Sequence, residues 1–187
     1  MKSPQIFTSL LMLFLALNVS SQTTTLNTFP SAVYLENGLT GMQETLHADT
    51  HQILLQALKA AGLEDVLDVS GPFTVFAPTN SAFAKLSPDE LEELFNEGNR
   101  KKLKDILTYH IVAGNFTASK ILKAMCRGEG KASFTTVQGK KIFATMEGTD
   151  IVLTDGMGNE AKITTADSGH ANGVIHQIDS VIVPPGL

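Results

Sequence analysis

Five histidines are the residues best suited to metal or proton chemistry, and two of them lie four positions apart. The spacing of His47 and His51 would place both imidazoles on one face of a helix, as in metal-binding pairs. However, His47 is not followed by the glutamate of the catalytic zinc pattern, and Asp49 and Thr50 interrupt the helical pattern. We therefore expect two exposed or capping histidines and no metal site.

Two further histidines occupy positions that favour structural roles. His176 lies in the run VIHQI at 174–178, where apolar residues occur on both faces of a predicted strand. This strand is expected to be central, with a buried imidazole that needs hydrogen-bond partners. His110 follows Tyr109 at a predicted helix-to-strand junction, where a ring can bond the last helical carbonyl groups. A structural role is favoured for both histidines over a catalytic or ligand-binding role.

The sequence contains no recognisable arrangement for nucleophilic catalysis. It has no G-x-S-x-G turn and no glycine-rich phosphate loop, and Cys126 lies near a predicted helix end without an evident base. Asp155, Asp167 and Asp179 are candidate carboxylates. The first two lie beside turn residues, where Asp normally bonds its own backbone. We therefore predict no catalytic residue.

A basic run, RKKLK at 100–104, follows an acidic run, DELEE at 89–93. The basic run could bind a polyanion or an acidic glycan. Charges at helical spacing usually face water, so two solvated helix faces are the favoured interpretation. The net charge of −5 argues against a nucleic-acid-binding protein, which needs clustered Lys and Arg for phosphate contacts.

These residues are positioned by predicted helices in the first half of the chain and by predicted strands in the second. After a helical pattern that includes Met42 and Leu46, helices are expected at 53–61, 80–86, 88–98, 100–109 and 117–128, with Gly62, Asn80, Ser87 and Thr117 as stop or cap residues. Strands are expected at 73–77, 111–113, 134–137, 141–146, 151–154, 161–165 and 174–183. Short turns separate the later strands, so most pairings should be antiparallel. The pattern predicts an α+β fold in one domain.

The N-terminus has the composition of a secretory signal peptide. Lys2 is its only charge, residues 6–17 are mainly apolar, and small residues follow at Ser20 and Ser21. The apolar stretch is shorter than the roughly 20 residues that span a bilayer. We expect a signal peptide at 1–21, a flexible leader at 22–36 and a folded domain at 37–187, with no membrane span after cleavage. A single Cys excludes an intramolecular disulfide.

Three segments resemble the fasciclin domain family. Residues 71–83, GPFTVFAPTNSAF, resemble its first signature box, and residues 109–112, YHIV, resemble its central Tyr-His motif. Residues 172–179, NGVIHQID, resemble its second box. The three segments occur in the family's order, and the resemblance covers about residues 37–185.

The resemblance implies a fasciclin-like fold, with N-terminal helices packed on a wedge of mostly antiparallel β-sheet. It implies that Thr79 and Asn80 open a helix after a core strand, and that His176 and Asp179 lie at the centre of the sheet. It also implies that the segment Tyr109-His110 is the candidate for adhesion. Family members are exported or surface-attached and mediate cell adhesion, without enzymatic activity or a cofactor.

The leading hypothesis is a secreted, single-domain adhesion or interaction module. Its partners would be extracellular matrix, a cell-surface protein or a glycan, and its location would be extracellular, the cell surface or, in a bacterium, the periplasm. The alternative is an extracellular carrier of a small apolar ligand or pigment, with a pocket lined by Phe116, Phe134 and Phe143. A hydrolase is the least supported interpretation.

Overall fold

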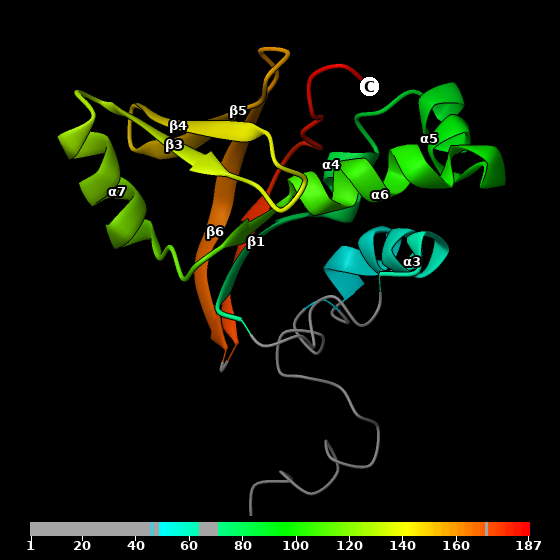
Figure 1. Cartoon of the computed structure of the whole chain (residues 1–187), viewed down its shortest axis with the longest axis horizontal. Coiled ribbons are helices and arrows are strands. Elements are labelled where there is room, and N and C mark those ends of the chain that lie inside the picture. Colours follow the sequence, from blue (N-terminus) through cyan, green and yellow to red (C-terminus); the bar gives the residue numbers. More distant parts are fainter. Residues whose placement is uncertain (1–45, 47–48, 64–70, 171) are drawn as a thin grey trace, which may run out of the picture. The chain divides into compact units, whose positions relative to one another are not determined.

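The structure is a computed structural model that describes residue 46 and residues 49–63, 71–170 and 172–187 (Figure 1). The predicted signal peptide at 1–21, the leader at 22–36, Met42 and His47 lie outside these residues. The described part combines helices with a seven-stranded sheet, so the predicted α+β class is confirmed.

The sheet places the strands of the two signature boxes side by side. Its strand order is β2-β1-β7-β6-β5-β4-β3. β1 and β7 run parallel, with Phe76 opposite His176, and the other neighbouring strands are antiparallel. The strands are β1 (Phe73–Pro78), β2 (Ile111–Ala113), β3 (Lys131–Thr135), β4 (Lys141–Glu147), β5 (Asp150–Thr154), β6 (Glu160–His170) and β7 (Gly173–Ile178). The mostly antiparallel sheet is thus confirmed, with one parallel pair, formed by the second and third strands of the order.

The two outermost strands of the sheet meet at one end. An isolated antiparallel bridge joins Val112 of β2 to Thr136, the residue that follows β3. The Val137 N–H donates a hydrogen bond of 2.7 Å to the carbonyl oxygen of Ile111. The sheet therefore curls until β2 is bonded to the turn between β3 and β4.

Helices begin and end where local side-chain chemistry permits. Gly62, with φ 66°, ends the helix that precedes it, because glycine adopts the left-handed conformation without steric cost. Ser87 and Glu90 form the predicted capping box, in which each side chain accepts a hydrogen bond from the other's backbone N–H. The helices are α3 (Gln52–Ala61), α4 (Asn80–Phe83), α5 (Pro88–Phe95), α6 (Arg100–Tyr109) and α7 (Ala118–Arg127), with short 3-10 helices η1 (Asp49–His51) and η3 (Glu97–Asn99).

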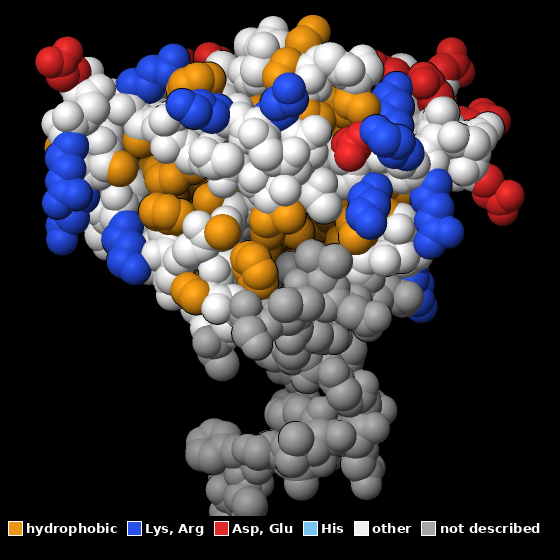
Figure 2. Space-filling view, viewed as in Figure 1, with side chains coloured by type: hydrophobic (Ala, Val, Ile, Leu, Met, Phe, Trp, Pro, Cys, Tyr) orange, Lys and Arg blue, Asp and Glu red, His pale blue; other side chains and the backbone are white. Residues whose placement is uncertain are grey.

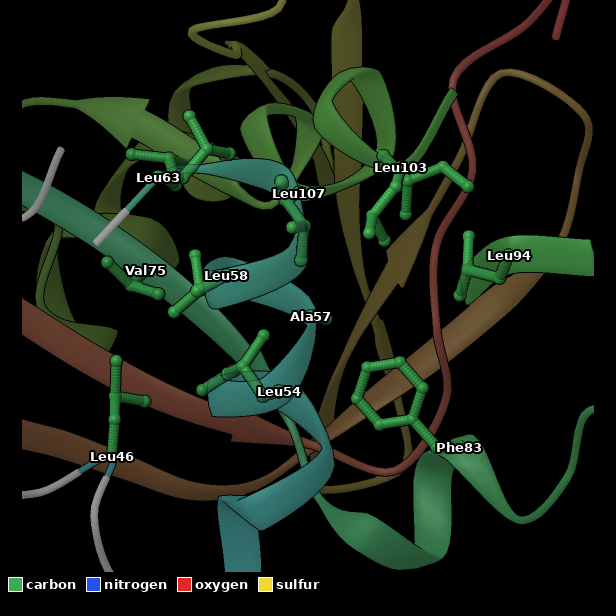
Figure 3. Close-up of a cluster of buried hydrophobic side chains, with 14 of the residues drawn as sticks. Leu46, Leu54, Ala57, Leu58, Leu63, Val75, Phe83, Leu94, Leu103 and Leu107 are labelled. Atoms are coloured by element: carbon green, nitrogen blue, oxygen red, sulfur yellow. The ribbon is translucent and has the colours of Figure 1, made fainter. Parts of the chain in front are cut away.

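Two hydrophobic clusters fill the described part of the chain. Figure 3 shows the first, in which α3 directs Leu54 and Leu58 toward Val75 of β1 and leucines of α6. The second contains Phe76 and packs α7 against β3 and β4. Val75 and Phe76 belong to different clusters because successive side chains of a strand point to opposite faces. Both faces of β1 and β7 are therefore buried, as predicted for a central strand.

Several predicted boundaries shift in the structure. The predicted strand 134–137 is found at 131–135, because the backbone N–H and the hydroxyl of Thr136 both donate to the carbonyl oxygen of Lys140 and form the turn. The predicted strand 161–165 extends to His170 through two irregularities of register. β7 ends at Ile178 rather than continuing to residue 183. α5 ends at Phe95 rather than Gly98, because Asn96 adopts an extended conformation.

Candidate functional site

The six residues singled out from the sequence lie at several places around β1, β2 and β7 rather than in one cluster. They are Thr79, Asn80, Tyr109, His110, His176 and Asp179. Among the described residues, no hydrogen bond or ion pair joins the side chains of any two of them. Each side chain bonds a different segment of backbone or a different surface residue.

Thr79 and Asn80 connect β1 to two helices. Thr79 is the N-terminal cap of α4, since its hydroxyl accepts a hydrogen bond of 3.3 Å from the Ala82 N–H. Asn80 was expected to be this cap and is instead the first helical residue. Its amide oxygen accepts from the Ile53 N–H at 3.0 Å, and its amide nitrogen donates to the carbonyl oxygen of Asp49 at 2.7 Å. Asn80 therefore positions the start of α3.

Tyr109 is fully buried at the end of α6 and connects it to the second half of the sheet. Its hydroxyl donates a hydrogen bond of 2.8 Å to the carbonyl oxygen of Lys141. The same hydroxyl accepts one of 3.2 Å from the Gly156 N–H. Burial raises the pKa of this phenol, so the neutral form that donates to Lys141 is maintained.

His110 is buried, and both of its ring nitrogens are occupied. Nδ1 lies 2.8 Å from the carbonyl oxygen of Ile106, to which it can only donate, and Nε2 accepts from the Ile182 N–H at 3.3 Å. The ring therefore bonds a late carbonyl of α6, as predicted, and also the segment that follows β7. Only the neutral ring satisfies both contacts, and burial lowers the pKa of His110 to about 4.

His176 is fully buried on β7 and connects the sheet to the start of α7. Nε2 donates to the carbonyl oxygen of Phe116 at 2.8 Å, and Nδ1 accepts from the Asp167 N–H at 3.2 Å. The ring also stacks on Phe76, with centroids 5.7 Å apart. Burial lowers the pKa of His176, which favours the neutral ring that this arrangement requires.

Asp167 has a role that its turn position did not predict. Its carboxylate accepts a hydrogen bond of 2.8 Å from the Ala118 N–H, the first residue of α7. Thr117, the predicted cap of α7, forms no side-chain cap hydrogen bond. A negative charge near a helix N-terminus is stabilising, so Asp167 and His176 together connect β6 and β7 to α7.

The expectation that Asp179 lies at the centre of the sheet is wrong: the residue follows the end of β7, and 33% of its side chain is exposed. Its carboxylate accepts from the backbone N–H of Lys162 at 2.8 Å and forms an ion pair of 2.9 Å with Lys85. Partial burial favours the neutral carboxyl group, but the hydrogen bonds from Lys85 and Lys162 outweigh it. The pKa of Asp179 is therefore lowered.

Comparison with known proteins identifies the family. The sequence model of the Fasciclin domain matches residues 49–184. The chain belongs to the fasciclin domain family. Protein sll1483 of Synechocystis sp. is 36% identical over 165 residues, which cover 88% of this chain and 84% of that protein. Immunogenic protein MPB70 of Mycobacterium bovis is 36% identical over 128 residues, which cover 66% of this chain and 55% of that protein.

A solved structure supports the assignment of the fasciclin fold. The FAS1 domain pair of the insect cell adhesion molecule Fasciclin I superposes with a TM-score of 0.53 at 24% sequence identity. The similarity covers 81% of this chain and 47% of that one, which holds two domains. The fasciclin-like arrangement of helices on a mostly antiparallel sheet is therefore confirmed.

Asp155 is a further polar residue of this fasciclin domain, and the sequence indicated only part of its role. It accepts hydrogen bonds from Met157 and Asn159 in its own turn, as expected for a turn Asp. However, it is 97% buried and also accepts from the Val183 N–H at 3.0 Å. With His110, it bonds two consecutive backbone N–H groups of the C-terminal segment. No local pattern could have predicted this contact across 28 residues.

His51 was expected to be exposed or capping. It occupies the N-cap position of α3 without a side-chain cap hydrogen bond, and the expected exposure is wrong. The side chain is fully buried, its Nδ1 lies 3.0 Å from the Thr50 hydroxyl, and Nε2 has no hydrogen-bond partner. Burial lowers the pKa of His51. No group of three or more His, Cys, Asp or Glu residues within the described ranges could hold a metal ion.

The remaining sequence hypotheses concern surfaces and pockets. In the basic run 100–104, Lys101 pairs with Asp105 and Lys102 pairs with Glu93, both at 2.9 Å, as expected for solvated helix faces.

Of the three phenylalanines proposed to line a carrier pocket, Phe116 and Phe134 pack edge to face with centroids 4.9 Å apart. A pocket of about 560 Å³ lies elsewhere, beside Ala60, Phe95, Asn96, Glu97, Arg100 and Leu103.

Proposed function

We propose that this fasciclin domain is an exported or surface-associated module that acts by binding extracellular partners, not by catalysis. The proposal is supported first by the family, whose solved member described above is a domain pair of a cell adhesion molecule. Its partners would be matrix components, cell-surface proteins or glycans, as the sequence hypothesis states.

One structural observation carries the proposal. The polar residues of the family-like motifs are used inside the domain, because both ring nitrogens of His110 and of His176 bond neighbouring chain segments. The Tyr109 hydroxyl likewise forms two hydrogen bonds inside the domain, one as donor and one as acceptor. A neutral imidazole that forms a hydrogen bond through each of its two ring nitrogens has no free nitrogen for proton transfer or metal binding. Partner binding is therefore assigned to surface side chains.

The Tyr109-His110 segment supports adhesion indirectly in this proposal. Both side chains are at most 2% exposed, so a partner would not contact them in the folded domain. Their substitution would reduce adhesion by destabilising the fold. A variant that loses adhesion while its thermal unfolding is unchanged would contradict this explanation.

Export and retention can be tested in one experiment. The full chain is expressed in a bacterium, and the protein is quantified in cytoplasm, cell surface, biofilm matrix and medium, followed by N-terminal sequencing. We expect a chain that starts near Gln22 and is retained with cells or matrix. Within the described ranges, no helix is long and apolar enough to cross a membrane. Cytoplasmic accumulation of the uncleaved chain, or equal retention of an unrelated secreted protein, would refute the proposal.

A further inference from the structure

The charge of this chain is distributed unevenly along its sequence. Between Asp105 and Glu147, Glu129 is the only acidic residue, whereas six basic residues occur in the same segment. The segment carries a net charge of +5 on a chain of net charge −5, which leaves −10 for all other residues. The basic residues lie on α7, on β3, in the β3–β4 turn and at the start of β4: Lys120, Lys123, Arg127, Lys131, Lys140 and Lys141.

These six cations are exposed and are not neutralised by carboxylates. Every ion pair among the described residues is formed by a lysine outside this group. The nearby carboxylates of Glu147 and Asp150 face Lys162, at 2.6 and 3.8 Å. In Figure 2, Lys and Arg side chains lie around the region of α7, β3 and β4, with hydrophobic side chains between them. An uncompensated basic surface attracts an anionic partner.

The outward face of the β3–β4 hairpin combines two of these cations with an aromatic ring. The ammonium group of Lys131 lies 4.1 Å from the centroid of the Phe143 ring. Lys141 occupies the same face two positions before Phe143. We call this surface the hairpin face; it consists of Lys131, Ser133, Thr135, Lys141, Phe143 and Thr145. The alternate residues, such as Phe134 and Ile142, point into the second hydrophobic cluster.

The register determines the shape of the hairpin face. Lys131 is opposite Thr145 and Lys141 is opposite Thr135, so the two lysines are four strand positions apart. At about 3.3 Å per residue, this separation is about 13 Å along the strands. Ser133 is opposite Phe143, so the ring lies between the strand positions of the two lysines, with the Lys131 ammonium group over it. The face is a narrow strip with a lysine position at each end and an aromatic ring in the middle.

This combination matches a polymer of charged sugars. Lysine ammonium groups pair with carboxylate or sulfate groups as compact point charges. Serine and threonine hydroxyls donate to and accept from sugar hydroxyls. The half-buried ring of Phe143 can contact the C–H face of a sugar ring when the flexible Lys131 side chain turns from the ring to an anionic group. Charges spaced along a strip favour a linear chain with repeated anionic groups over a small compact anion.

We infer that the hairpin face binds a linear acidic polysaccharide. The inference rests on the proposed function, for which it names the class of partner. The acidic helix α5 of a second copy of this chain is a weaker candidate for the partner of the hairpin face. There, Glu93 is already paired with Lys102 at 2.9 Å, and Glu90 bonds its own helix cap.

Binding can be measured by isothermal titration calorimetry with the full chain. The probes are polygalacturonate and heparin as acidic polysaccharides, dextran as a neutral one, and double-stranded DNA as a non-sugar polyanion. The test variant is K131S/K141S, and the control K59S/K104S removes the same charge from exposed positions on α3 and α6. Phe143→Leu tests the ring while keeping an apolar side chain. Far-UV circular dichroism confirms that each variant is folded.

We expect binding to at least one acidic polysaccharide and none to dextran. K131S/K141S should bind about tenfold more weakly, because two exposed charge contacts are lost, and its affinity should depend less on salt. The control should bind like the wild type, and Phe143→Leu should bind more weakly without a change in the salt dependence.

Three outcomes would overturn the inference: equal weakening in K59S/K104S, binding to DNA as tight as to the polysaccharides, or no binding to either acidic polysaccharide. In the last case, continued retention of the protein in the matrix would leave the proposed function intact and assign it to another surface. Loss of retention together with intact polysaccharide binding would instead refute the proposed function.

Discussion

The buried imidazole of His110 should make the stability of this domain depend on pH. Its pKa is about 4 in the folded chain, below the ordinary value of 6.5 that applies to the unfolded chain. The stabilising contribution is therefore fully present above pH 6.5 and is lost as the pH falls toward 4, because the unfolded chain binds the proton more tightly. At pH 5 these two values correspond to a loss of about 2 kcal/mol.

The assay is urea unfolding of the wild type and of His110→Gln at pH 7.5 and pH 5. At pH 7.5 the variant should be about 1–3 kcal/mol less stable, because the contacts to Ile106 and Ile182 are lost or distorted. Its further loss between pH 7.5 and pH 5 should be about 2 kcal/mol smaller than that of the wild type. Other buried histidines titrate in both proteins, so the comparison isolates His110.

Tyr109→Phe is the control for a destabilised variant that keeps every histidine, since the raised pKa of Tyr109 leaves its phenol neutral between pH 5 and pH 7.5. Its stability difference between the two pH values should follow that of the wild type. If His110→Gln and the wild type lose the same free energy of unfolding between pH 7.5 and pH 5, the neutral buried imidazole is refuted as a source of the pH dependence.

Three further substitutions test other parts of the fold. Tyr109→Phe should lower the free energy of unfolding by about 1–2 kcal/mol in urea titrations, since it leaves the Lys141 carbonyl and the Gly156 N–H unpaired; an unchanged midpoint would contradict the assigned contacts. Ser87→Ala should cost about 1 kcal/mol and accelerate amide exchange at the start of α5, whereas equal acceleration in α6 would argue against a local cap. Gly173→Ala should prevent folding or lower the thermal midpoint strongly, because a Cβ would collide with the Phe73 carbonyl in a backbone with φ 151°; a wild-type melting curve would exclude this close approach.

Much of the fold could be predicted because its signals are local. The Ser87 capping box, the end of α3 at Gly62 and the two-sided burial of β7 depend on residues within a few positions of each other. The central location of His176 followed from the same local pattern. These predictions were confirmed because local backbone chemistry and the tertiary structure agree at these positions.

The predictions that failed depend on contacts between distant segments. Thr79 and Asn80 are both good caps, and only the position of α3 shows that Asn80 bonds residues 27 and 31 positions earlier. His51 looked polar and exposed, but its burial depends on what packs over it. Asp167 could not be assigned to α7 because the hydrogen bond crosses 49 residues. Sequence spacing carries no information on such pairings.

The closure of the sheet between β2 and the β3–β4 turn affects how copies of this domain can associate. A sheet edge with free N–H and C=O groups can accept an additional strand from another chain, which leads to aggregation or domain swapping. Here the Val112–Thr136 bridge and the bond from Val137 to Ile111 occupy backbone groups at that edge. Crowded copies at a surface are thereby protected from joining sheet to sheet at this position, and a partner that binds there must engage side chains.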